Sequence, residues 1–459
     1  MNSFFKSVSI DLRSLGLFRI LIGVVLFVEF LFALINADYF YNNNSFFSKE
    51  LIQSSFGPNF LSLFFFNDSA QFVSICLVLG MVASILFIVG RYYKVSQIFL
   101  LLLWGSLVNR NLVIANSGDD ILFLALLWSL FLPLDEAFSL KSKTTIKPYN
   151  LTHPMTLPFI LQLMFIYVFA SFEKAHPVWN QAFTAIEYTL HLDSLRTAFG
   201  AWLLNFPIIL KAGTWLTYYG EFIGPCLFFI PIFYSRILII FFFIFLHCFI
   251  LLTLNIGSFP LICIIYWLAL LPSEFWDMLA DVTYVSMEQT QIRCSNLKPF
   301  AFCLGAFLFI MNCFYVINSS FLPYVEPVTN LLRLRQKWSM FAPAPKTGDG
   351  RLVFQGNLKN GTIVDVHPPY SRLSEGYKRD DFSNTFLYPN TRWHKVAENL
   401  RSRDFSSFLI PFAKWVCREQ KTNQLEWLYL YVVEGPTVLG QENITLPRRL
   451  LIRWECSKT

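Results

Sequence analysis

The feature that most constrains this chain is a series of apolar runs, each about as long as a membrane is thick. Crossing about 30 Å of hydrocarbon takes about 20 apolar residues in a helix, because each residue adds about 1.5 Å. Such runs occupy residues 15–35, 71–90, 95–113, 119–134, 155–173, 215–234, 237–254, 257–272 and 299–318. They predict a polytopic α-helical membrane bundle with about nine transmembrane helices. Within 237–272, Asn255 and Gly257 interrupt one long run and each half is short, so the helix count there stays open.

The composition agrees with a chain that lies mostly in lipid. Hydrophobic residues make up 55% of it and charged residues only 14%, whereas globular domains average roughly 45–50% and about 25%. The net charge of +6 is spread thinly and forms no basic run, so we expect the lipid bilayer as a partner and no nucleic acid. The first apolar run is long enough to span and no small-residue cleavage pattern follows it, which favours a membrane helix over a signal peptide.

The last third of the chain has the composition of a soluble domain. We therefore divide the chain into a transmembrane domain, 1–322, and a small soluble α+β domain, 323–459. In the latter, Asn360-Gly361 separates two apolar runs and predicts a hairpin with a type I′ turn. Residues 392–418 are expected to be helical with a break at 405–408, and residues 425–434 and 450–455 are expected to be strands.

Basic residues in the short loops predict the orientation. Lysine and arginine collect on the cytoplasmic side of membrane proteins. Here they lie before the first span and then after the second, fourth and sixth spans: Lys6, Arg13, Arg91, Lys94, Lys141, Lys143, Lys147 and Arg236. The N-terminus is thus expected in the cytoplasm and, with nine spans, the soluble domain outside the cell membrane. Cys417 and Cys456 are the only cysteines of that domain. Because an extracytoplasmic compartment is oxidising, they are predicted to form a disulfide. No CxxC pair occurs, so no metal is expected.

Ionisable residues within the apolar runs are the candidates for function. Each costs about 2.5–3.5 kcal/mol at the centre of a membrane even on a mild scale. Among the few that the chain keeps are Arg19, Arg110, Asp119, Asp120, Glu173, Lys174, Glu221 and His247. Structural roles are the alternatives. Lys174 at a helix end resembles an interfacial anchor, His247 in mid-span is compatible with a bond to a backbone carbonyl, and Arg110 with Asp119 and Asp120 is compatible with a local ion pair.

Several short motifs, in this order, resemble the HTTM ("horizontally transferred transmembrane") family, which is related to vitamin K-dependent γ-glutamyl carboxylase. The resemblance covers roughly residues 10–320. It rests on the segments 17–20 (LFRI), 109–111 (NRN), 118–120 (GDD), 131–133 (FLP), 167–174 (YVFASFEK) leading to Trp179, Glu221 with Pro225, and 247–248 (HC) leading to 256–259 (IGSF). Residues 336–343 (QKWSMFAP) and Arg392-Trp393 resemble landmarks of the C-terminal extension found in bacterial HTTM proteins.

The resemblance implies a function. In the carboxylase, a lysine matching Lys174 is the base that deprotonates vitamin K hydroquinone, and the histidine matching His247 is functionally important. By this resemblance Lys174 and His247 are the expected catalytic residues, and Arg110, Asp119, Asp120 and Glu221 are expected to shape the pocket. The expected cofactor is a reduced quinone, used with O2 and CO2, and the expected location is the bacterial inner membrane. The chain departs from the carboxylase at Glu173, where the family has a first lysine, and in its shorter extracytoplasmic domain.

Two functions remain open on this basis. The first is a quinol-dependent, carboxylase-like lyase that acts at the outer face of the membrane. The alternative is a non-catalytic membrane protein that assists the maturation or export of a secreted peptide or protein. The first function requires a specific geometry. Arg110, Asp119, Glu221 and Lys174 should then converge on one cavity in the outer half of the bundle, with His247 as its floor, because partners or cavity water lower the cost of burying charge.

Overall fold

The structure is a computed structural model of the chain. It describes residues 8–57, 59–140, 150–151, 153–280, 298–317, 319–334, 338–346, 348–367, 372–375, 389–419, 425–436 and 448–458. Lys6, Lys141, Lys143 and Lys147 of the orientation argument, and Gln336 and Lys337 of the 336–343 motif, lie outside the described residues.

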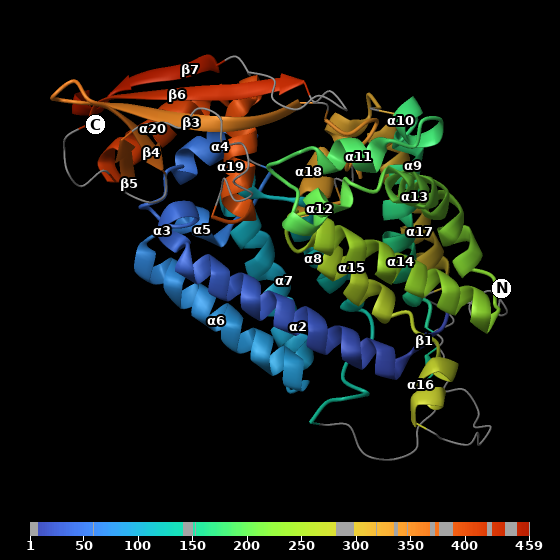
Figure 1. The fold of residues 1–459 in the computed structure, drawn as a ribbon. Helices are drawn as coiled ribbons and strands as arrows, with labels where there is room; N and C mark the ends of the chain where they lie inside the picture. Colours follow the sequence, from blue (N-terminus) through green and yellow to red (C-terminus); the bar gives the residue numbers. More distant parts are fainter. Residues whose placement is uncertain are drawn as a thin grey trace.

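A helix lies in each of the nine apolar ranges within the part of the chain that the structure describes (Figure 1). These helices are α2 (Leu12–Ile35), α6 (Ala70–Val89), α7 (Tyr93–Arg110), α8 (Ser117–Ser129), α9 (Thr156–Glu173), α13 (Pro207–Phe228), α14 (Phe233–Thr253), α15 (Phe259–Leu268) and α17 (Lys298–Val316). Shorter elements connect them: β1 (Ile10–Asp11), β2 (Asn150–Leu151), α3 (Ala37–Phe40), α4 (Lys49–Phe56), α5 (Leu63–Phe66), α10 (Pro177–Asn180), α11 (Ala185–Leu190), α12 (Ala198–Leu203), α16 (Ser273–Ala280) and α18 (Leu322–Leu331).

The number of helices that can cross a membrane is smaller than nine. Among the described residues, five helices are long and apolar enough, namely α2, α6, α9, α14 and α17. A sixth candidate is α15 together with α16, which are bent by 84° at the break between them. The reason is length as much as composition: α8 has 13 residues and α15 has 10, which at about 1.5 Å per residue gives about 20 and 15 Å of the 30 Å required.

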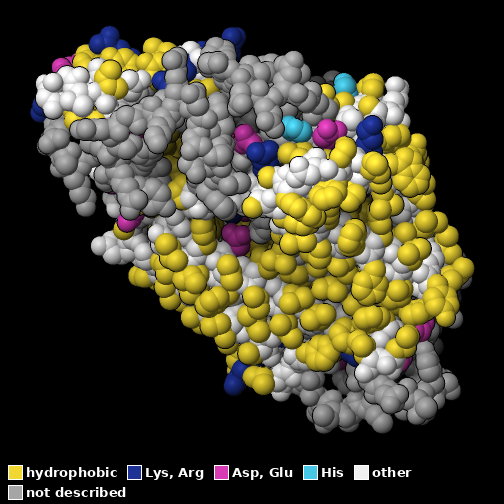
Figure 2. Space-filling view, in the orientation of Figure 1, with side chains coloured by type: hydrophobic (Ala, Val, Ile, Leu, Met, Phe, Trp, Pro, Cys, Tyr) yellow, Lys and Arg dark blue, Asp and Glu magenta, His cyan; other side chains and the backbone are white. Residues whose placement is uncertain are grey.

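The outside of the bundle is apolar over most of its height. Figure 2 shows hydrophobic side chains covering the face formed by α13, α14 and α15, with charged side chains gathered toward its two ends. Large apolar side chains stand out from the helices, including Leu102, Leu238 and Phe245, each about two-thirds exposed. Soluble monomers rarely expose apolar patches larger than a few hundred Å². The protein is accordingly an integral membrane protein whose helices contact lipid.

Basic residues of the orientation argument lie together at the end of the bundle opposite the C-terminal domain. Arg13 pairs with Asp11 and with Asp277 of α16, and Lys94 donates to the carbonyl of Leu132 at 3.2 Å. Arg19 is fully buried there and does not extend toward the membrane surface. Its guanidinium donates to backbone carbonyls at the end of α6 and in the segment after α8, those of Phe87, Ile88, Leu134 and Phe138.

The C-terminal domain is a five-stranded antiparallel sheet with helices on one face (Figure 1). Its strands lie in the order β5-β4-β3-β6-β7, where β3 is Gly348–Leu358, β4 Ile363–His367, β5 Arg372–Glu375, β6 Leu425–Pro436 and β7 Arg448–Glu455. The helices are α19 (Thr391–Arg401), the 3-10 turn η3 (Arg403–Phe408) and α20 (Leu409–Glu419). The expected hairpin, the helical region with its break and the last two strands are therefore confirmed, and the domain is α+β.

The turn of the first hairpin differs from the expected type. A type I′ turn needs positive φ at both central residues, but only Gly361, at φ +82°, has it, and Asn360 does not. Gly361 N–H donates to the carbonyl of Leu358, and Leu358 N–H donates to that of Thr362. The Asn-Gly pair thus predicted the position of the turn correctly but not its type. The loop here is longer than a two-residue turn, and it needs the left-handed conformation at Gly361 alone.

The C-terminal domain packs on the bundle through aromatic side chains. Trp393 and Trp415 of α19 and α20 lie edge-on against Tyr39 at 5.7 and 5.9 Å between ring centroids. Phe46 contacts both tryptophans as well, and Phe47 meets Phe408 at 4.9 Å. These rings come from the segment between α2 and α6. The domain therefore lies against that segment, at the end of the bundle opposite Arg13 and Lys94.

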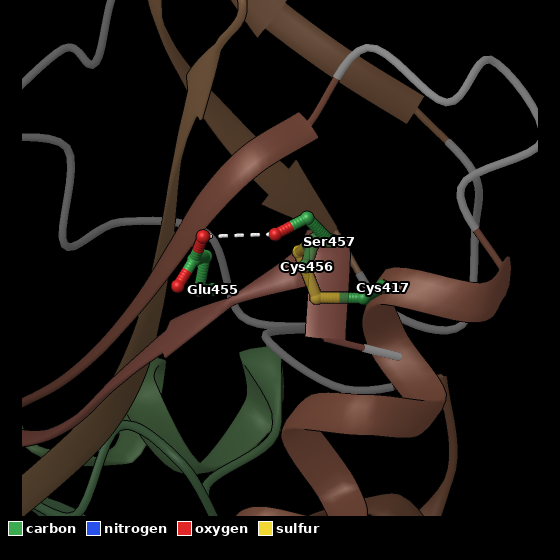
Figure 3. The surroundings of a disulfide bond; sticks show 4 residues. All are labelled: Cys417, Glu455, Cys456 and Ser457. Carbon is green, nitrogen blue, oxygen red and sulfur yellow. Dashed lines mark hydrogen bonds between the residues drawn. A yellow bond between two sulfur atoms is a disulfide. The ribbon is translucent and has the colours of Figure 1, made fainter.

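Cys417 and Cys456 form the expected disulfide, which joins the end of α20 to the end of β7 (Figure 3). Their Cα atoms are 5.4 Å apart, within the range a disulfide requires. Closing 39 residues of chain removes freedom mainly from the unfolded state.

We expect reduction of this bond to lower the free energy of unfolding of the C-terminal domain by about 2–4 kcal/mol. Thermal unfolding of the detergent-solubilised protein with and without reductant measures this. Cys226→Ser, at an exposed free cysteine, is the control and should leave the reductant effect unchanged. Equal unfolding temperatures in both conditions would contradict the assignment.

Candidate functional site

A cavity of about 90 Å³ lies near the end of the bundle that faces the C-terminal domain. Side chains from α9, α11, α13 and α14 form most of its wall, and Phe259 at the start of α15 completes it. Most of the wall is apolar. Its ionisable groups are Lys174, Glu221, His247 and Tyr167. The structure therefore brings together three of the residues singled out by the sequence, Lys174, Glu221 and His247.

Lys174 and Glu221 form a buried ion pair on one side of the cavity. Lys174 follows the last residue of α9 and is 4% exposed, while Glu221, inside α13, is 8% exposed. The Lys174 ammonium donates directly to Glu221 Oε2 and lies 4.7 Å from the centre of the Trp179 ring. Burying either charge alone would cost several kcal/mol. The carboxylate and the π face together explain why a lysine is tolerated here.

His247, which also lines the cavity, is the last member of a hydrogen-bonded chain. Its Nε2 lies 2.7 Å from the hydroxyl of Tyr167 on α9, and that hydroxyl also accepts the indole N–H of Trp267 at 2.8 Å. All three side chains are at most 2% exposed. The other ring nitrogen, Nδ1, is buried and has no hydrogen-bond partner among the described residues. A buried polar atom without a partner is uncommon in folded proteins.

The segment that precedes β3, the first strand of the C-terminal sheet, lies over the cavity. Trp338, Met340 and Phe341 line it, and the Phe341 carbonyl accepts the indole N–H of Trp179 at 3.0 Å. Trp338 also contacts the ring of Phe259 at 6.2 Å between centroids. We call residues 338–341 the roof. Part of the 336–343 motif, to which the sequence assigned no chemistry, is thus a wall of the site.

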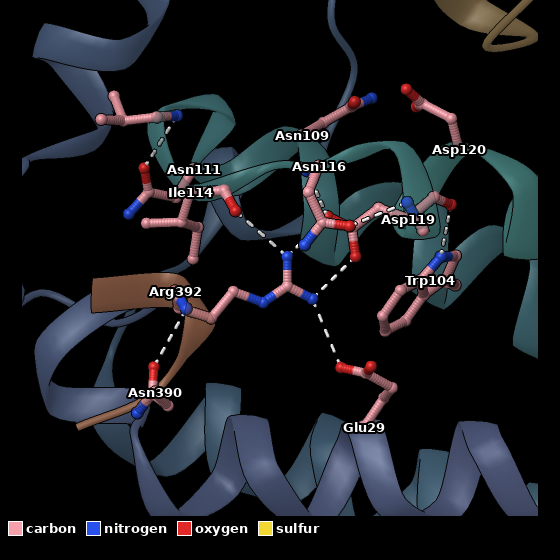
Figure 4. Close-up of polar contacts among 12 residues, drawn as sticks. Glu29, Trp104, Asn109, Asn111, Ile114, Asn116, Asp119, Asp120, Asn390 and Arg392 are labelled. Carbon is pink, nitrogen blue, oxygen red and sulfur yellow. Dashed lines mark hydrogen bonds and ion pairs between the residues drawn. The ribbon is translucent and has the colours of Figure 1, made fainter. Parts of the chain in front are cut away.

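The structure separates Arg110, Asp119 and Asp120 from this cavity, which corrects the expectation of one shared pocket. Asp119 accepts two hydrogen bonds from Arg392 of α19, at 2.5 and 2.7 Å, and Glu29 lies 3.3 Å from the same guanidinium (Figure 4). Asp120 pairs with Arg333 at 2.6 Å. The acidic pair at the start of α8 is therefore neutralised by arginines that come more than 200 residues later in the chain.

Arg110 also has a structural role, because its partners lie in the segment between α2 and α6. It is fully buried at the end of α7, and it donates to the carbonyls of Asn42 and Phe47, each at 3.2 Å, and pairs with Asp68 at 3.6 Å. It therefore fastens the segment between α2 and α6. The alternative of a local ion pair between Arg110 and the two aspartates also differs from the structure, because their partners lie in other elements.

Arg392 keeps its charge in this setting. Burial by itself lowers the pKa of Arg392, but the carboxylate of Asp119, with Tyr41 and Glu29, outweighs burial and holds that pKa well above its usual value. Arg392 N–H and the N–H of Trp393 are capped by the side chain of Asn390. The 392–393 landmark thus joins an ion pair to an aromatic contact, and both connect the C-terminal domain to the bundle.

No protein-family model, curated protein or solved structure matches this chain.

Sequence reasoning did not single out Trp267, which donates to the Tyr167 hydroxyl. It quoted Tyr167 and Trp179 as parts of a motif but gave neither a role, whereas Tyr167 bonds His247 and Trp179 covers Lys174. A usable signal was present for two of them. A tyrosine hydroxyl or an indole N–H in an apolar span needs a partner when buried, so Tyr167 and Trp267 pointed to a polar group among the helices.

We expect Arg392→Met to lower the free energy of unfolding by about 3–5 kcal/mol, because it leaves Asp119 buried without its partner. Thermal unfolding and protease resistance of the purified protein measure the change. Lys395→Met, on the same helix but in a half-exposed pair with Glu398, is the matched control and should cost less than about 1 kcal/mol. Adding Asp119→Asn to Arg392→Met should recover part of the loss. Equal effects of the two single variants would contradict a docking role for Arg392.

Proposed function

We propose that the chain is a membrane-embedded enzyme of the carboxylase-like type, with its proton-transfer centre at the cavity between Lys174, Glu221 and His247. Its substrate or cofactor would be a lipid-soluble molecule with an acidic hydroxyl, such as a reduced quinone. The observation that carries the proposal is the combination of a buried lysine–glutamate pair and an unpartnered histidine nitrogen in one cavity. Ionisable groups that converge in one largely apolar cavity are candidates for acid–base sites.

The ion pair supplies the acid–base function. As a pair, the Lys174 ammonium and the Glu221 carboxylate share one proton that can lie on either group. Transfer of that proton to Glu221 leaves a neutral amine on Lys174, which is the form able to remove a proton from a hydroxyl. Glu221 thus acts as the proton reservoir of Lys174. From the sequence, Glu221 was expected only to shape the pocket.

The residues fit the reactive oxygen of a quinol but not its whole ring. Lys174 and His247 both line the cavity, so a hydroxyl bound there would have both residues in its wall. The volume of about 90 Å³, however, is below the roughly 150 Å³ of an engineered protein cavity that accepts benzene. Binding of a ring therefore requires part of the wall to move. The roof is the part of the wall outside the helical bundle, and we expect it to move outward.

The family resemblance supplies the remaining parts of the proposal. They are membership of the HTTM family, O2 and CO2 as co-substrates, and a secreted peptide or protein as the acceptor of the carboxyl group. The same holds for the place in the cell: a bacterial inner membrane, with the N-terminus in the cytoplasm and the C-terminal domain outside. Support for this orientation comes from Arg13 and Lys94, which lie at the end of the bundle away from that domain.

The enzyme proposal predicts that membranes containing the protein consume reduced vitamin K in an oxygen-dependent manner, beyond membranes that lack it. Lys174→Met and Glu221→Gln should each lower the rate by about 10²–10⁴-fold, the usual contribution of a positioned acid or base. Chromatography of the extracted quinones measures the rate. Lys211→Met is the control, because Lys211 lies on α13 but is exposed. Its rate should be unchanged.

The unfolding temperature of each variant is measured as the control for correct folding. A wild-type protein that consumes no hydroquinone, and whose native mass spectrum shows no bound quinone, would overturn the enzyme proposal.

The orientation predicts the reactivity of two engineered cysteines toward an impermeant thiol reagent in intact cells. Lys359→Cys, in the exposed hairpin turn of the C-terminal domain, should be labelled without lysis. Arg91→Cys, exposed between α6 and α7, should be labelled only after lysis. Labelling is read by gel shift, with the wild-type protein as background for its own free cysteines. The reverse pattern would place the C-terminal domain in the cytoplasm.

The alternative function, assistance in the maturation or export of a secreted peptide, has one observation in its favour. Trp427, Tyr429 and Tyr431 alternate along β6 on the face of the sheet away from the core. Arg453 lies over Trp427 at 3.9 Å, and the two tyrosine rings stack at 6.2 Å. Aromatic residues and arginine are enriched at protein interfaces. If maturation or export of the peptide is lost with Tyr429→Ser but retained with Lys174→Met, this function is favoured.

A further inference from the structure

The direction of each hydrogen bond around His247 follows from the chemistry of its partners. An indole N–H can only donate, so Trp267 donates to the Tyr167 oxygen, as the 2.8 Å contact shows. The Tyr167 hydroxyl still has its own proton to donate. The acceptor at 2.7 Å is His247 Nε2, and an imidazole nitrogen that accepts carries no proton of its own.

The thiol of Cys263 is the other neighbour of the Tyr167 hydroxyl. A thiol sulfur is a weak acceptor, whereas an unprotonated imidazole nitrogen is a strong one. The tyrosine proton therefore goes to His247 Nε2, and the thiol is left to donate weakly to the remaining lone pair of the oxygen. Trp267, Tyr167 and His247 then form a chain in which every donor has an acceptor, up to the histidine ring.

We infer that His247 is held as the neutral tautomer with its proton on Nδ1, and that this N–H is a hydrogen-bond donor reserved for an acceptor oxygen of the ligand. Nδ1 is the remaining polar atom of a ring that lines the cavity, and it has no partner among the described residues. Tyr167 and Trp267 are positioning residues, because they act on the ligand only through the tautomer of His247.

This inference rests on the proposed function in taking the cavity as the ligand site, and it narrows the ligand class. The molecule must present one hydroxyl oxygen that offers a lone pair to His247 and its proton to Lys174, as a phenolic or enolic oxygen does. His247 is then not a second base. As Lys174 takes the proton, negative charge develops on the same oxygen, and a neutral imidazole N–H stabilises it, as preorganised donors do in oxyanion holes.

The tautomer can be read by nitrogen NMR on full-length protein labelled with ¹⁵N-histidine, with the His247 signals assigned from a His247→Gln sample. We expect a protonated Nδ1 and an unprotonated Nε2 without added ligand. Tyr167→Phe removes only the hydroxyl and should convert His247 partly or fully to the Nε2–H tautomer. A wild-type His247 protonated on Nε2 would overturn the inference.

Two control variants separate a tautomer effect from a general disturbance of the core. Tyr266→Phe removes a buried hydroxyl that bonds the Phe159 carbonyl instead, and Cys263→Ala removes the competing thiol. Both should leave the tautomer unchanged. A shift of the tautomer in Cys263→Ala would show that the thiol controls the tyrosine proton and would overturn the assignment.

The ligand class is tested with two probes of similar shape, cyclohexanone, which carries an acceptor oxygen, and methylenecyclohexane, which does not. Cyclohexanone should shift the His247 Nδ1 signal, and methylenecyclohexane should not. Equal effects of the two probes would overturn the donor role. Because the tautomer is measured without turnover, its failure is distinguishable from that of the enzyme proposal, which depends on hydroquinone consumption and on Lys174.

Discussion

Ionised and hydrogen-bonding groups in an apolar interior need partners, and the rest of this structure depends on how that requirement is met. A bare charge costs several kcal/mol in such surroundings. Arg19 is satisfied by backbone carbonyls, Lys174 by Glu221, and Asp119 by Arg392. Each of these contacts joins elements that are distant in sequence. The polar residues of the bundle are therefore also the points at which its elements are fastened together.

The contact between Asp119 and Arg392 shows why the C-terminal domain is placed as it is. Arg392 reaches from α19 to the start of α8, and the aromatic rings of Trp393 and Trp415 pack on Tyr39 beside it. The ion pair constrains the orientation of α19 on the bundle, since two hydrogen bonds constrain the guanidinium plane. The rings add apolar contact area. Together they bring residues 338–341 over the cavity, so that a segment outside the membrane bundle closes a site inside it.

The cavity itself combines two polar arrangements with different roles. One is the buried ion pair of Lys174 and Glu221. The other is the hydrogen-bonded series of Trp267, Tyr167 and His247. Proton transfer needs a group that can change its protonation state, whereas charge stabilisation needs a donor that does not change. Under the proposed function, the ion pair meets the first need and His247 meets the second.

The sequence by itself determined the membrane class, the positions of nine helices, the hairpin, the last strands and the Cys417–Cys456 pair. These follow from local pattern: apolar run length, strand composition, a glycine that accepts positive φ, and the count of cysteines in one domain. It also singled out Lys174, Glu221 and His247, because charge in an apolar run is conspicuous wherever it occurs.

Only the tertiary structure decided which charged groups meet. Arg110, Asp119 and Asp120 resemble pocket residues in the sequence, yet Asp68, Arg392 and Arg333 are their partners. Helix lengths were also decided there, since an apolar run such as 257–272 continues past the end of α15. The reason is physical. Local pattern reports the cost of burying a group, whereas the partner that removes this cost can lie anywhere along the chain.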